Sequence, residues 1–178
     1  MTPTVRDFLP SGAKAVAELR GAALPPGVRL HTGADFEADP RRLYEADAEA
    51  AADEPGDVPA DAIAYEGWLL RTWEHPPLDL DLTSVVTVDG EIASFTLAAT
   101  DGRTRYSCAT AGTRRAFRGR GLARLAKTAS LRRARAAGYT EAVTGNDAAN
   151  APMLAVDQAF GYRPCAGEWR CVHELRRD

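Results

Sequence analysis

Cysteine is scarce in this chain: three residues, Cys108, Cys165 and Cys171, occur among 178. A small and odd number excludes the disulfide framework of a small secreted domain. None of the three stands at metal-ligand spacing from another cysteine or from a histidine, and the histidines are scattered: His31, His75 and His173. We therefore expect reduced thiols, a cytoplasmic protein and no metal site.

Long apolar runs are absent as well. No stretch approaches the roughly 18 apolar residues that a membrane-spanning helix needs. Asp7, Lys14 and Glu18 interrupt the N-terminal segment, which is therefore not expected to be a signal peptide. A length of 178 residues, 45% of them hydrophobic, predicts one domain able to bury a core.

Acidic residues are missing from residues 103–135, which hold 11 lysines and arginines. Residues 1–102 carry 19 acidic and 7 basic residues, a balance of −12, whereas residues 103–178 carry 6 and 15, a balance of +9. The two halves should therefore face different partners. The basic segment indicates either a solvated helix or a site for a polyanion, namely a nucleic acid or a phosphorylated cofactor.

The N-terminal residues 1–27 are predicted to be an appendage, because they end in Pro25-Pro26-Gly27, which interrupts helices and strands. The domain proper then covers residues 28–178. Its first half predicts a strand over 28–31, a helix from 39–40 to 52, and a second helix over about 60–73.

The pattern then changes to strands in an α/β arrangement. Asp89-Gly90 predicts a tight turn between two of them, so that three successive strands form an antiparallel meander. Gly138 is expected to end the long helix that follows. The predicted elements are strands 82–88, 91–99 and 105–113, a helix from 121, strand 141–144, helix 151–160, and strands near Tyr162 and over 169–175.

The loop between strand 105–113 and the long helix has the character of an anion site. Unpaired backbone N–H groups and the positive end of the helix dipole converge there, and small residues let the backbone approach phosphate oxygens. No Gly-Lys-Ser/Thr follows, so the loop is not a Walker P-loop. Arg124 stands where the third glycine of a dinucleotide fingerprint would be, which excludes that motif too.

Arg118-x-x-Gly121-x-Ala123 resembles the Gln/Arg-x-x-Gly-x-Gly/Ala acyl-CoA signature of the GNAT superfamily of N-acetyltransferases. The segment from Thr144 to Tyr162 resembles that family's next strand, its Asn-led helix and its closing Gly-aromatic step. The resemblance covers about residues 28–175 and is best over 105–164. It is closest to actinobacterial-type proteins, in particular the C-terminal half of tandem GNAT proteins, so that residues 1–27 are interpreted as the remnant of an upstream repeat.

This resemblance implies a mixed, mostly antiparallel sheet of six to seven strands flanked by about four helices. Strands 105–113 and 141–144, the fourth and fifth, would be splayed apart to admit the pantetheine arm of acetyl-CoA. The implied reaction is direct acetyl transfer to an amine in a ternary complex, with acetyl-CoA as cosubstrate and no metal.

The same resemblance implies which residues bind acetyl-CoA. Backbone groups of three residues would contact pantetheine: Ala111, Gly112 and Thr113. Main-chain N–H groups of the loop would hold the pyrophosphate: Arg118, Gly119, Arg120, Gly121, Leu122 and Ala123. Three side chains would lie along the arm: Asn146, Asn150 and Met153.

The family often places a general-acid tyrosine seven residues after the helix-leading asparagine, but Asp157 occupies that position here. Asp157 is expected on the inward helix face, either bonded locally or in contact with the thiol or acceptor. The N–H of Thr113 is the expected donor to the thioester oxygen. Candidate bases are Glu54, Asp53, or a water held by strand atoms such as those of Ser107 or Thr110.

The acidic first half is expected to build the acceptor side and to favour a cationic primary amine. Tyr65, Trp68 and Trp73 fit either the core or the pocket wall, whereas Cys108 is expected in the core. The alternative is a degenerate acyl-CoA-binding or nucleic-acid-binding module. The loop already accounts for the arginines and no aromatics follow Phe117, so no nucleic-acid partner is expected. No membrane partner is expected, and the protein is predicted to be a monomer or homodimer.

Overall fold

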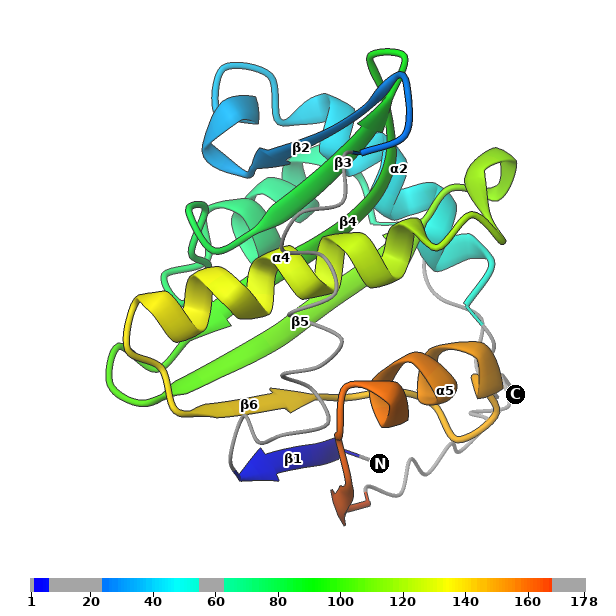
Figure 1. The fold of residues 1–178 in the computed structure, drawn as a ribbon. Helices are drawn as coiled ribbons and strands as arrows, with labels where there is room; N and C mark the ends of the chain where they lie inside the picture. Colours follow the sequence, from blue (N-terminus) through cyan, green and yellow to red (C-terminus); the bar gives the residue numbers. More distant parts are fainter. Residues whose placement is uncertain (1, 7–23, 55–62, 168–178) are drawn as a thin grey trace, which may run out of the picture.

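The computed structural model describes residues 2–6, 24–54 and 63–167. They form a mixed seven-stranded sheet in the order β2-β3-β4-β5-β6-β1-β7, with helices on both faces (Figure 1). The strands are β1 (Thr2–Arg6), β2 (Val28–Thr32), β3 (Ser84–Val88), β4 (Glu91–Thr100), β5 (Arg105–Thr113), β6 (Glu141–Thr144) and β7 (Pro164–Ala166). The helices are α2 (Arg41–Ala52), α3 (Tyr65–Trp68), α4 (Leu122–Ala136) and α5 (Ala151–Ala159), with short turns η1 (Ala34–Phe36), η2 (Leu69–Trp73) and η3 (Arg115–Phe117).

The predicted meander is confirmed. β3, β4 and β5 pair antiparallel in sequence order, and β5 and β6 have the predicted bounds. Asp89 and Gly90 both have positive φ, +50° and +86°, as a tight hairpin turn between β3 and β4 requires. Gly138, with φ +96°, follows the end of α4 as expected.

The second helix differs from its prediction. Ala64 is extended, so α3 begins at Tyr65, and from Leu69 the chain continues as a π-helix to Trp73. The wider turn places residues five apart next to each other. It stacks Trp73 on Trp68 with ring centroids 5.7 Å apart, and the Glu74 N–H donates to the Leu69 carbonyl.

The two ends of the described chain add two strands to the sheet. The predicted strand near Tyr162 is β7, which begins at Pro164 just after the buried Tyr162, and the predicted strand 169–175 lies outside the described residues. The sequence predicts that residues 1–27 are an appendage to a domain that begins at residue 28. Thr2–Arg6 nevertheless form β1, which pairs antiparallel with β6 and β7 and so covers the outer edge of β6.

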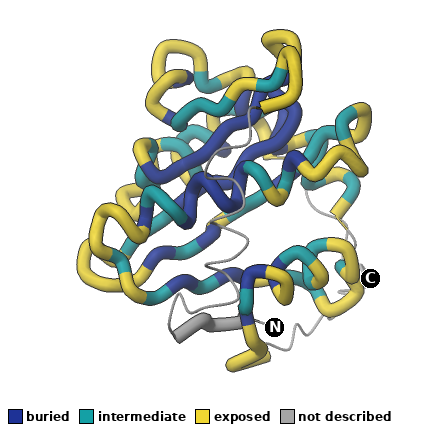
Figure 2. Tube along the Cα trace, viewed as in Figure 1, coloured by how far each residue is buried: buried dark blue, intermediate teal, exposed yellow. Residues whose placement is uncertain are grey.

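Side chains alternate between the two faces of the central strands. Val85 packs with Leu43 of α2 and Trp68 of α3, whereas Val86 packs with Leu122 and Ala126 of α4. The buried positions are concentrated in these strands and in α4 (Figure 2). Helices α2 and α3 therefore cover one face of the sheet, and α4 covers the other.

The predicted splay of the two strands is confirmed. The parallel pairing of β5 and β6 covers only Arg105–Cys108 and Glu141–Thr144, after which β5 continues to Thr113 paired with β4 alone. A bulge accompanies the parting, since Leu97 pairs with Thr110 and Ala98 with Cys108, leaving Ala109 as the extra residue. The sheet thus has an opening beside residues 109–113.

Candidate active site

A cleft of about 730 Å³ occupies this opening. Its walls come from α2, the second half of β5, the start of α4, the end of β6 and α5. Of the predicted site residues, those that line it are Glu54, Ala111, Gly112, Thr113, Arg118, Gly119, Gly121, Leu122, Ala123, Asn146, Asn150 and Met153. Arg120 and Asp157 are not among its lining residues.

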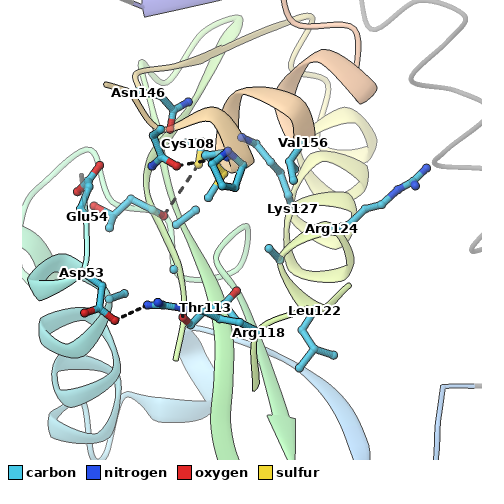
Figure 3. Close-up of a pocket in the computed structure, with 18 of the residues that line it drawn as sticks. Asp53, Glu54, Cys108, Thr113, Arg118, Leu122, Arg124, Lys127, Asn146 and Val156 are labelled. Carbon is cyan, nitrogen blue, oxygen red and sulfur yellow. Dashed lines mark hydrogen bonds and ion pairs between the residues drawn. The ribbon is translucent and has the colours of Figure 1, made fainter. Parts of the chain in front are cut away.

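The cleft reaches both faces of the sheet. Figure 3 shows Asp53 and Glu54 at the end of α2 on one side of Cys108 and Thr113, and Leu122 and Lys127 of α4 on the other. α2 lies close against β5 here, because a Cβ on Gly112 would stand 2.5 Å from that of Ala50. The cleft is therefore lined by residues from both sides of β5.

The start of α4 has the backbone geometry on which the predicted anion site depends. Gly119 and Gly121 have φ of +74° and +75°, and Gly121 is the N-cap residue, which has no side chain to cover the first-turn amides. Those amides have no intrahelical acceptor, and the helix dipole adds positive potential to them. A phosphate group fits this end of the cleft.

The arginines beside this site are engaged by an acid. Asp53 pairs with both Arg115 and Arg118. Figure 3 shows its pair with Arg118, which also donates from Nε to the Thr113 carbonyl at 3.0 Å. Hydrogen bonds from Arg115, then from Arg118, hold the pKa of Asp53 below its usual range. Asp53 is thus a poor proton acceptor. Glu54, the other carboxylate among the candidate bases, is exposed at the cleft wall.

The residues expected beside the pantetheine arm all line the cleft, but the side chains of two of them bond to other residues of the protein. The Asn150 side chain caps α5 by accepting from the Met153 N–H at 3.3 Å. The Thr113 hydroxyl lies 2.9 Å from the Ser94 hydroxyl. The roles of these residues toward acetyl-CoA stay predictions.

Asp157 belongs to a buried network. It forms an ion pair with Lys127, and both side chains are 2% exposed. Its other oxygen accepts from the Asn146 amide, and the Lys127 ammonium lies 5.0 Å from the centre of the Tyr162 ring. The sequence left two alternatives for Asp157, local bonding or contact with the thiol or acceptor. These contacts match local bonding, because Asp157 does not line the cleft itself and bonds to two residues that do, Lys127 and Asn146.

Two functional candidates were missed at the sequence level. Lys127 lines the cleft from α4, and Asp47 lines it from α2. Asp47 is buried and accepts from Trp68 Nε1 at 2.7 Å. Burial, and to a smaller extent the charge of Glu54, raises its pKa, against the lowering effect of the Trp68 bond. The available signal was position in the chain, because Asp47 lies in the helix that leads into Asp53 and Glu54.

The remaining candidates are core residues. Cys108 is buried, its side chain packs in the core between α4 and α5, and burial raises the pKa of its thiol. Tyr65, Trp68 and Trp73 pack against α2 and do not line the cleft. Within residues 24–54 and 63–167 no group of three His, Cys, Asp or Glu side chains is arranged to hold a metal. In the same ranges no helix is long and apolar enough to cross a membrane.

The fold of the chain is similar to that of several solved N-acetyltransferases. No family model matches the chain, and no curated protein matches it in sequence. A GCN5-related N-acetyltransferase from Sphaerobacter thermophilus superposes with a TM-score of 0.56 at 25% identity, over 79% of this chain and 42% of that one. A tandem GNAT protein from the clavulanic acid biosynthesis pathway gives 0.62 at 19% identity, over 92% and 49%.

A third solved structure is that of the aminoglycoside N-acetyltransferase AAC(6')-Iy in complex with a bisubstrate analogue of CoA. It superposes with a TM-score of 0.56 at 16% identity, over 84% of this chain and 97% of that one. The chain spans less than half the length of the first two relatives. The chain therefore has the fold of the GNAT N-acetyltransferases, as the signature around Arg118 and Gly121 predicts.

Proposed function

We propose that the protein is an acetyl-CoA-dependent N-acetyltransferase that transfers acetyl directly to a primary amine. The observation that carries this proposal is one continuous cleft at the parted strands, lined by α4 on one side and by α2 on the other. Acetyl-CoA supplies the activated acyl group. The α4 amides and the small residues of β5 bind its phosphates and arm, which leaves the α2 face for the acceptor.

The α2 wall supports a cationic acceptor. Three carboxylates line the cleft from this segment: Asp47, Asp53 and Glu54. Two arginines neutralise Asp53, so Asp47 and Glu54 supply the negative charge that an ammonium group would meet. The acetyl acceptor named for the aminoglycoside relative is of this cationic class.

The test is acetyl transfer to a panel of amines: polyamines, aminoglycosides, amino acids and peptides with free amino groups. CoA thiol release and the mass of the product are measured, with amine-free reactions as the control. We expect release that depends on a cationic amine, with a kcat/KM that falls as salt screens the acidic wall.

Three results would contradict the proposal. Acetyl-CoA binding without transfer to any amine would indicate an acyl-CoA-binding module. Failure to bind acetyl-CoA, together with tight and salt-sensitive DNA binding, would indicate a nucleic-acid binder. A best acceptor that is anionic at the assay pH would overturn the cationic class while leaving acetyl transfer in place.

A further inference from the structure

Asp47 is a buried carboxylate on the acceptor face of the cleft. Its Oδ2 accepts from Trp68 Nε1 at 2.7 Å, whereas no described residue donates to Oδ1. Asp47 is 9% exposed and lines the cleft, so a ligand on the α2 side of the cleft lies next to this residue. A buried carboxylate with an open acceptor position is costly unless a ligand or proton completes it.

The other acids near the cleft have different surroundings. Asp53 is paired with two arginines, and Asp157 is paired with Lys127 behind the cleft wall. Glu54 is exposed at the end of α2. Of the cationic residues that line the cleft, Arg124 and Lys127 come from α4, whereas Arg118 comes from the loop before α4 and pairs with Asp53. Cys108, which also lines the cleft, is buried.

We propose that Asp47 is the catalytic residue that removes the proton from the ammonium group of the acceptor, with Trp68 fixing the orientation of its carboxylate. This inference rests on the proposed acetyl transfer. Burial raises the pKa of Asp47, which makes its carboxylate a stronger base than an exposed aspartate.

Asp47 takes one proton from the ammonium group, which leaves a lone pair on the nitrogen. The new C–N bond forms as the C–S bond of the thioester breaks, and the second amine proton leaves on the sulfur as the thiol. Asp47 then releases its proton to solvent, so the net products are the amide, CoA thiol and one proton.

The test uses Asp47→Asn, which is isosteric and still accepts from Trp68 Nε1. Kinetics are measured from pH 6 to 10 with the amine that the wild type acetylates fastest, and acetyl-CoA affinity is measured by calorimetry. We expect kcat/KM for the amine to fall by about 10²-fold or more near neutral pH. The defect should shrink as the pH approaches the pKa of the acceptor, where the amine is already neutral.

Glu45→Gln is the matched control, because Glu45 is an exposed carboxylate on the same helix that does not line the cleft. It should retain wild-type kinetics, and both variants should bind acetyl-CoA within about twofold of the wild type, well below the effect expected of a lost acid–base group.

Wild-type kinetics in Asp47→Asn would overturn the assignment while leaving acetyl transfer intact. A loss that is equal at every pH and is accompanied by weaker acetyl-CoA binding would also overturn it, because that pattern belongs to a structural residue. A wild type that transfers acetyl to no amine overturns the proposed function and this assignment together.

Discussion

The two faces of the cleft are built by different means. On the α4 face, the proposed binding of acetyl-CoA would depend on backbone amides and on two glycines with positive φ, Gly119 and Gly121. On the α2 face, it depends on side chains, above all Asp47, whose properties come from contacts with another helix. The first kind of site is encoded locally, and the second exists only after the chain has folded.

The largest effect is expected from Gly121→Glu, which acts on the α4 face alone. The substitution forces a side chain into a left-handed conformation and places a negative charge at the phosphate end of the cleft. A titration calorimeter should detect no acetyl-CoA binding.

Gly102→Glu is the control for backbone strain, since Gly102 has a similar φ of +68°, has open space around it and lies outside the cleft. It should be destabilised to a similar extent and still bind acetyl-CoA. Equal binding loss in both variants would show that strain, rather than the anion site, is responsible.

The next effect concerns the buried ion pair that joins α4 to α5. Lys127→Met leaves the Asp157 carboxylate buried without its cation, which should lower the free energy of unfolding by about 3–5 kcal/mol. Denaturant titration measures this, and the paired replacement Lys127→Met with Asp157→Leu should recover much of the loss.

Asp157→Asn alone separates the two roles considered for this residue. A structural partner predicts a lower Tm with kcat within a few-fold of the wild type. A kcat that falls by about 10²-fold in the folded variant, with an altered pH profile, would restore Asp157 as a proton-transfer group.

The features that could be predicted from the sequence are those that depend on neighbouring residues, and the features that could not are contacts between distant ones. The signature at Arg118–Ala123, the Asp89-Gly90 turn and the period-two strands were readable because each depends on neighbouring residues. The bond of Asp47 with Trp68, the pairing of Lys127 with Asp157 and the engagement of Asp53 by two arginines join residues 21 to 65 positions apart. No local pattern encodes those partners, so the acceptor side could be predicted only as acidic.

A smaller effect should appear in the pH dependence of stability. The pKa of Asp47 is raised on folding above its ordinary value of 3.8, mainly by burial. Its contribution to stability is therefore fully present below that ordinary value and is lost as the pH rises through the folded-state pKa. The Tm of the wild type relative to Asp47→Asn should fall as pH rises from about 4 toward 7, and a difference independent of pH would contradict this.

The smallest effect is expected from Asp53→Asn. The acid competes with phosphate for Arg115 and Arg118, whereas the Arg118 bond to the Thr113 carbonyl does not depend on it. Removing the charge should tighten CoA binding a few-fold in calorimetry at low salt, the size expected of exposed ion pairs. Weaker binding would mean that Asp53 instead organises the loop.

The most direct test of a cleft that holds both substrates at once is the initial-rate pattern with acetyl-CoA and the preferred amine varied together. Direct transfer between two faces of one cleft predicts lines that converge in a double-reciprocal plot, and no acetylated protein when acetyl-CoA is incubated without amine. Parallel lines together with an acetyl group on the protein, for example on Cys108, would contradict the account.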